Sequence, residues 1–126
     1  MDQLRQAGVP TDAIGVVAPY SAQVARLHQH PSLRGIDIGS VNAFQGREKP
    51  VILVSWVRSN PDGQLGFVTD LRRLTVAWSR ARCLLIQVGD LATLSTFPRF
   101  ADAAERLGSD VVTAWEPPWA EVLELL

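Results

Sequence analysis

The sequence predicts an α/β fold in which helices cover both faces of a mainly parallel β-sheet, giving a three-layer domain. Short apolar runs alternate with segments of helical periodicity, which is typical of parallel strands joined by right-handed crossovers. The run 51–57 is almost entirely apolar, as expected of a strand covered on both faces. With 126 residues, 47% of them hydrophobic and 20% charged, the chain is long enough for one core.

The expected elements follow in order along the chain. Strands are expected at residues 14–18, 36–40, 51–57 and 83–89. Helical segments are expected at 2–8, from Pro19 to about His28, and at 71–82, 91–95 and 99–107, with Asp70 as an N-cap. Residues 1–107 form the expected domain. Residues 108–126, which contain two tryptophans and two prolines, form the expected C-terminal extension.

Composition excludes several classes of protein. The net charge of −1 argues against a general polyanion binder, although it leaves room for a local basic surface. A lone Cys83 and only two histidines, His28 and His30, exclude an intrachain disulfide and a zinc cluster, so no metal site is expected. No apolar stretch reaches membrane-spanning length and the sequence opens without a signal peptide. The expected compartment is the cytoplasm, or the nucleus in a eukaryote.

The segment 41–48 lies between two expected core strands and carries both glycine and charged residues. It is predicted to be a loop held at both ends by the sheet, and open α/β sheets bind ligands at the carboxyl ends of their strands. Phe44 is expected in the core rather than as a platform for base stacking. Arg47 fits either a phosphate contact or pairing with a neighbour.

Three blocks of sequence resemble motifs IV, V and VI of superfamily 1 helicases: residues 19–23, 41–48 and 72–82. Their order and spacing are similar to the second RecA-like domain of the 5′-to-3′ group (superfamily 1B), which includes the nonsense-mediated-decay and immunoglobulin-mu-binding helicases. The resemblance covers roughly residues 8–105. Departures from the family pattern include Asn42 in place of an aspartate, Pro50 in place of an acidic residue, and Thr75, Trp78 and Ser79 within motif VI.

The resemblance implies a role in ATP hydrolysis. Arg80 matches the arginine finger, which places positive charge on the γ-phosphate, and its planar fork of donors suits phosphate oxygens. Glu48 matches a glutamate that contacts the nucleotide, and Gln45 and Gly46 lie on the same loop. From spacing alone, a surface ion pair is a real alternative for Arg80, and the family resemblance reverses the preference in favour of the arginine finger.

The resemblance also implies a track for single-stranded DNA or RNA. Hydroxyls and backbone N–H groups hold such strands mainly through their sugar–phosphate backbone. The matching positions are Pro19, Tyr20, Ser21, Ser40, Val41 and Asn42. Tyr20 is equally well explained as a core ring with its hydroxyl at the rim.

Two sequence elements of a complete ATPase are missing. No Gly-Lys-Ser/Thr occurs, so the chain has no P-loop, and no Asp-Glu pair is present to hold Mg²⁺. ATP and Mg²⁺ are therefore expected to be held mainly by an N-terminal RecA-like domain of the same full-length chain. The chain alone is expected to be inactive.

These observations predict the C-terminal motor domain of an ATP-dependent DNA/RNA helicase or translocase. The alternative is a stand-alone, degenerate RecA-like module that binds nucleic acid or protein without catalysis. The motif VI departures and the start at Met1 favour this alternative, whereas retention of Glu48 and Arg80 argues against it. A generic nucleotide-binding fold is the weakest hypothesis, because no Gly-x-Gly-x-x-Gly follows any expected strand.

Overall fold

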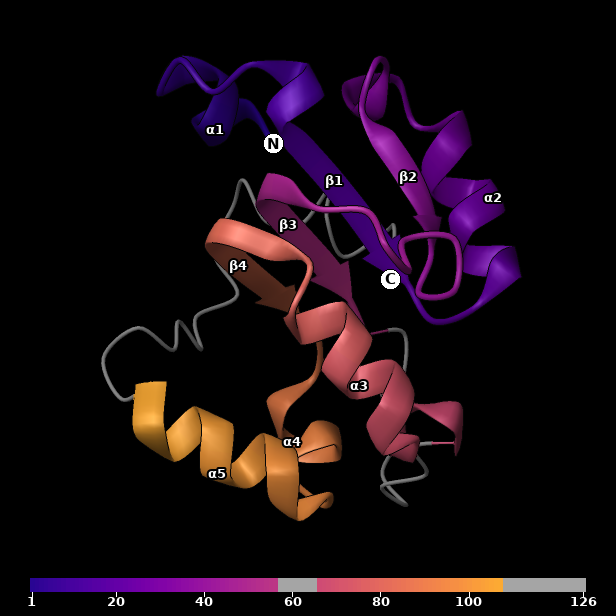
Figure 1. The fold of residues 1–126 in the computed structure, drawn as a ribbon, viewed down its shortest axis with the longest axis vertical. Coiled ribbons are helices and arrows are strands. Elements are labelled where there is room, and N and C mark those ends of the chain that lie inside the picture. The colour runs from indigo at the N-terminus through magenta and orange to yellow at the C-terminus, as the bar shows by residue number, and fades with distance from the viewer. Residues whose placement is uncertain (57–65, 108–126) are drawn as a thin grey trace.

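The computed structural model describes residues 1–56 and 66–107. Within them, four parallel strands form one sheet in the order β2-β1-β3-β4 (Figure 1). The strands are β1 (Ile14–Ala18), β2 (Asp37–Ser40), β3 (Lys49–Ser55) and β4 (Ala81–Val88). The predicted α/β class with a parallel sheet is confirmed.

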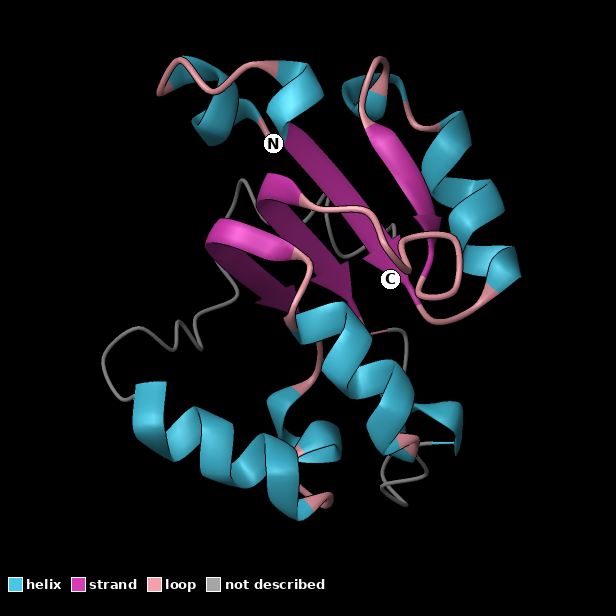
Figure 2. Cartoon of the chain, viewed as in Figure 1, coloured by secondary structure: helices cyan, strands magenta, loops and turns pink. Residues whose placement is uncertain are grey.

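Helices cover both faces of the sheet (Figure 2). Helices α1 and α2 contribute to the core on one face, and α3, α4 and α5 contribute to the core on the other. The helices are α1 (Asp2–Gln6), α2 (Ser21–Gln29), α3 (Leu71–Trp78), α4 (Leu91–Leu94) and α5 (Pro98–Leu107). Short 3-10 turns occupy Thr11–Ala13, Pro31–Leu33 and Gly66–Thr69.

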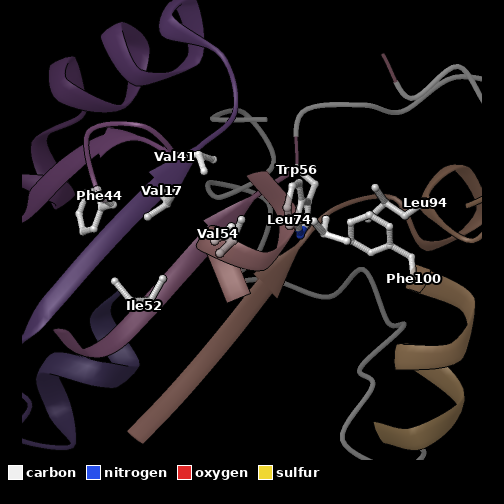
Figure 3. Close-up of a cluster of buried hydrophobic side chains, with 10 residues drawn as sticks. Val17, Val41, Phe44, Ile52, Val54, Trp56, Leu74, Leu94 and Phe100 are labelled. Atoms are coloured by element: carbon white, nitrogen blue, oxygen red, sulfur yellow. The ribbon is translucent and has the colours of Figure 1, made fainter. Parts of the chain in front are cut away.

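Strand β3 is the centre of the core because neighbouring residues point to opposite faces of the sheet. Ile52 and Val54 join the cluster beneath α3, whereas Val51 and Leu53 join the cluster beneath α2. All five residues of β3 from Val51 onward are buried, which confirms the expectation drawn from the apolar run. Figure 3 shows the first of these two clusters, which reaches from Val17 to Phe100.

Phe44 anchors the loop between β2 and β3 to the sheet. Its side chain is fully buried, as predicted. A Cβ atom on Gly15 of β1 would lie 2.8 Å from Cε1 of the ring, and one on Gly39 of β2 would lie 3.2 Å from two other ring carbons. The ring therefore occupies space that only glycine leaves on these two strands.

The predicted boundary between the helix 71–82 and the strand that follows it is wrong. Helix α3 ends at Trp78, and β4 begins at Ala81, where it pairs with Lys49. Arg80 thus lies in the turn between α3 and β4 and not on the helix. Strand β3 also begins at Lys49, earlier than predicted, and Val57 at its predicted end lies outside the described residues.

An aromatic cluster ties the end of α3 to β4 and α5. The indole N–H groups of Trp56 and Trp78 both donate to Oε1 of Gln87, at 3.0 and 2.7 Å. Both indoles pack edge-on to Phe100, with ring centroids 5.0 and 5.6 Å apart. The large ring at motif VI position 78 therefore belongs to the core under α5 and has a hydrogen-bond partner.

Candidate functional site

The segment 41–48 crosses from one edge of the sheet to the other. Because β2 and β3 are parallel, the end of β2 lies at the carboxyl edge and the start of β3 at the amino edge. Figure 2 shows this loop as it returns toward the start of β3. The segment is a loop held at both ends by the sheet, as predicted, but Glu48 and Arg80 lie at the amino edge and not at the carboxyl edge, where open α/β sheets commonly bind ligands.

Arg80 is held in place by three hydrogen bonds. Its Nε donates to the carbonyl of Val76 (3.2 Å), Nη1 to the carbonyl of Arg47 (3.4 Å) and Nη2 to Oγ of Ser79 (3.0 Å). The Val76 carbonyl lies in the last turn of α3, where a cation is favoured by the helix dipole. One N–H on each terminal nitrogen is left for another acceptor. No carboxylate among the described residues pairs with Arg80, so the ion pair that spacing left open is not formed there.

Arg80 and Glu48 are brought together through the backbone on both sides of Glu48. The carbonyl of Arg47 accepts from Arg80, and the N–H of Lys49 donates to the carbonyl of Arg80 at 3.1 Å. Glu48 itself is exposed. Two residues that lie 32 positions apart in sequence thus share one small region, which no spacing argument could establish.

Asp37 is a member of this region that the sequence did not indicate. Its carboxylate contacts the guanidinium of Arg47 and lies 3.7 Å from Nζ of Lys49. Lys49 also donates to the carbonyl of Asp12 at 2.8 Å, and the Arg47 guanidinium lies 4.9 Å from the centroid of the Phe44 ring. Of the two alternatives for Arg47, the structure shows pairing with a neighbour.

Gln45 and Gly46 lie at the exposed part of the same loop. Gly46 has φ +77°, a conformation that favours glycine, and a Cβ there would meet nothing within 4 Å. The backbone therefore requires glycine at this turn, and the space beside it is open to an approaching molecule.

The carboxyl edge carries the six positions expected to contact a nucleic-acid strand: Pro19, Tyr20, Ser21, Ser40, Val41 and Asn42. They follow β1 and β2, whose carboxyl ends lie side by side. Ser21 and Asn42 are exposed, whereas Val41 is only 3% exposed as a whole residue and offers little surface for contact. Oγ of Ser40 accepts from the N–H of Ala43 at 3.1 Å, so its own proton remains available.

Helix α2 begins at this edge without a side-chain cap on its first turn. The N–H groups of such a turn have no partner within the helix, and they favour anions. Below them, the buried Gln23 donates to Oγ of Ser55 at 3.5 Å and joins α2 to the end of β3. The start of α2 is thereby fixed on the sheet.

Residues 1–56 and 66–107 contain neither a metal-binding cluster nor a membrane-spanning helix. No group of three or more His, Cys, Asp or Glu residues there has the arrangement of a metal site. None of the helices in this part of the chain has the length and apolarity needed to cross a bilayer.

Comparison with known proteins gives the family. Residues 1–92 match the model of a family described as an AAA domain, and this range contains all three motif-like segments. The chain belongs to this family. The AAA domain here corresponds to the C-terminal region of superfamily 1 helicases, so the assignment made from the three motifs is confirmed.

The similar proteins are longer, and their names describe helicases or a regulator of nonsense transcripts. The DNA polymerase alpha-associated DNA helicase A of Saccharomyces cerevisiae is 39% identical over 125 residues, 96% of this chain and 17% of that protein. The DNA replication ATP-dependent helicase/nuclease DNA2 of Mus musculus is 39% identical over 109 residues, 83% of this chain and 10% of that protein. The regulator of nonsense transcripts 1 homolog of Drosophila melanogaster is 42% identical over 99 residues, 71% of this chain and 8% of that protein. The chain thus spans less than a fifth of each relative.

Proposed function

We propose that this AAA domain is the C-terminal motor domain of an ATP-dependent helicase or translocase that acts on single-stranded DNA or RNA. The names of two similar proteins, which describe DNA helicases, support this proposal. The observation that carries it is a pair of hydrogen bonds that brings Arg80 close to Glu48: the Arg80 side chain donates to the carbonyl of Arg47, and the N–H of Lys49 donates to the carbonyl of Arg80. Because the sequence lacks a P-loop, ATP and Mg²⁺ would be held mainly by an N-terminal RecA-like domain of the same full-length chain. This chain alone would be inactive.

Arg80 would act as the arginine finger. In phosphoryl transfer, a positive charge that is already in place stabilises the transition state most effectively, because no reorganisation is needed during the reaction. Three hydrogen bonds fix the Arg80 guanidinium beside the start of β3 and leave donors for phosphate oxygens. Closure of the two domains would carry it to the γ-phosphate. Glu48, Gln45 and Gly46 would contact the nucleotide from the same loop.

The carboxyl edge would hold the strand. The hydroxyl of the exposed Ser21 and the uncapped first turn of α2 suit phosphate groups, which give affinity without sequence preference. The first residues of segment 41–48 would contact the nucleic-acid strand, and its last residues would contact the nucleotide. Each opening and closing of the cleft between the two RecA-like domains would therefore move the contacts to the nucleic acid. Such a domain would work in the cytoplasm or nucleus, where its substrates are found.

The test is Arg80→Ala in a protein that joins this chain to its N-terminal RecA-like domain. We expect kcat for ATP hydrolysis to fall about 1000-fold, while ATP binding changes only a few-fold. Arg72→Ala is the matched control, because it removes an exposed guanidinium from the same motif, and it should hydrolyse ATP normally. Hydrolysis by Arg80→Ala at a near wild-type rate would refute the proposal. Absence of hydrolysis in the unmodified two-domain protein would favour the non-catalytic binding module.

A further inference from the structure

The loop beside Arg80 contains a charge arrangement that needs an explanation. Glu48 lies between two basic residues, Arg47 and Lys49, yet it forms no ion pair with any described residue. The two basic side chains instead share the carboxylate of Asp37. The carboxylate of Glu48 therefore stays exposed and available, although two cations flank it in sequence.

Asp37 is suited to this role by its place in the fold. It is the first residue of β2, and its side chain is 26% exposed. The side chains of its two partners, Arg47 and Lys49, are 49% and 24% exposed. A partly covered carboxylate that contacts two cations holds them more firmly than an exposed pair would. The other end of the same short strand holds the start of the loop, because Oγ of Ser40 accepts from the N–H of Ala43. Strand β2 thus holds both ends of the loop.

Asp37 is linked to Arg80 indirectly, through Arg47 and Lys49. Arg47 binds Asp37 with its side chain and accepts a hydrogen bond from Arg80 with its carbonyl. Lys49 likewise contacts Asp37 with its side chain and donates its backbone N–H to the carbonyl of Arg80. The position of the Arg80 guanidinium therefore depends on two residues that one carboxylate holds.

We infer that Asp37 is a positioning residue for ATP hydrolysis: it withdraws Arg47 and Lys49 from Glu48 and fixes the backbone on which Arg80 is oriented. This inference rests on the proposed function. Asp37 touches neither Glu48 nor Arg80, and it acts through the residues that flank Glu48. Without its charge, the two basic side chains are released toward Glu48 or toward nucleotide phosphates, and the Arg80 guanidinium loses its fixed support. A small displacement of a catalytic group is enough to slow a reaction strongly.

The experiment measures kcat and KM for ATP in the two-domain protein at saturating polynucleotide. Asp37→Asn, which keeps the shape and removes the charge, is expected to lower kcat about tenfold with KM changed less than about twofold. Asp37→Glu should restore most of the lost kcat. Asp12→Asn is the matched control, because Lys49 binds the backbone of Asp12 and not its exposed carboxylate, so kcat should not change.

The double variant Asp37→Asn/Arg80→Ala separates positioning from general damage. If Asp37 acts through Arg80, Asp37→Asn lowers the residual rate of Arg80→Ala by a clearly smaller factor than it lowers the rate of the unmodified protein. An equal additional loss in the Arg80→Ala background would overturn the inference, as would a normal kcat for Asp37→Asn alongside a severe loss for Arg80→Ala. Normal hydrolysis by Arg80→Ala would overturn the proposed function as well. Should Asp37→Asn fail to fold, Arg47→Met breaks the same contact from its exposed side and is expected to give the same pattern.

Discussion

The two edges of the sheet are built in different ways. At the amino edge, the charged groups of Arg80, Arg47 and Lys49 are all bound by neighbouring groups of the same chain. At the carboxyl edge, Ser21 and Asn42 are exposed, and the first turn of α2 has no side-chain cap. A group that stabilises a transition state benefits from being fixed beforehand, whereas a surface that tracks a moving strand benefits from contacts that exchange easily. The difference matches the two roles proposed for these edges.

Phe44 connects the two edges, and its removal should disrupt both. Phe44→Ala leaves a cavity over β1 and β2 and is expected to lower the free energy of unfolding by about 3–5 kcal/mol. Urea unfolding of the chain measures this loss. Phe97→Ala, which truncates a partly buried ring away from the loop, should cost less and should leave nucleotide and strand contacts unchanged. A loss smaller than that of Phe97→Ala would contradict the anchoring role of Phe44.

Gly15 and Gly39, which both lie against the Phe44 ring, allow the packing of this ring to be tested from two strands. A Cβ on Gly15 would lie 2.7 Å from Cδ1 of Ile52 and 2.8 Å from the Phe44 ring, whereas on Gly39 the nearest atoms would be 3.2 Å away. Gly15→Ala is therefore expected to destabilise the fold by about 1–3 kcal/mol, and Gly39→Ala by less. Thermal unfolding of both variants gives the order. Equal losses, or a larger one for Gly39→Ala, would show that the ring moves freely.

Gly46 and Gly8 offer a matched pair for the amino edge. Both have positive φ, +77° and +82°, and at neither would a Cβ meet an atom within 4 Å. Substitution by alanine should therefore cost about 1 kcal/mol of stability at each position through backbone strain alone. In the two-domain protein, Gly46→Ala should also slow ATP hydrolysis, whereas Gly8→Ala should not. Equal rates for the two variants would argue against a nucleotide contact at Gly46.

The sequence predicts the architecture well because burial leaves a readable pattern. Strand β3 is covered on both faces, so nearly every residue in it is apolar, and the run was visible without a structure. The end of α3 was not visible, because residues 79–82 continue the helical pattern and are compatible with a helix. Pairing of Ala81 with Lys49 decides that they leave the helix, and this pairing joins residues far apart in the chain.

The candidate site shows the same division. Glu48 and Arg80 were found through motifs, but their proximity depends on hydrogen bonds across two strands. Asp37 was missed because an acidic residue at the start of a strand is ordinary, and its contact with Arg47 follows from the path of the loop. Gln87 left a clearer signal, since it is a polar residue inside the apolar run 83–88, and it proves to be the acceptor for two indoles.

Because Trp56 and Trp78 share Gln87 as a hydrogen-bond acceptor, intrinsic tryptophan fluorescence can report on this region. Indole emission is sensitive to hydrogen bonding at the ring nitrogen, and Trp78 lies two residues before Arg80, with Trp56 on the same glutamine oxygen. With Trp115 and Trp119 replaced by phenylalanine, the remaining emission would come from these two rings alone. Any rearrangement of the turn that carries Arg80 would then change the colour or intensity of fluorescence, and it could be followed in real time without an attached dye.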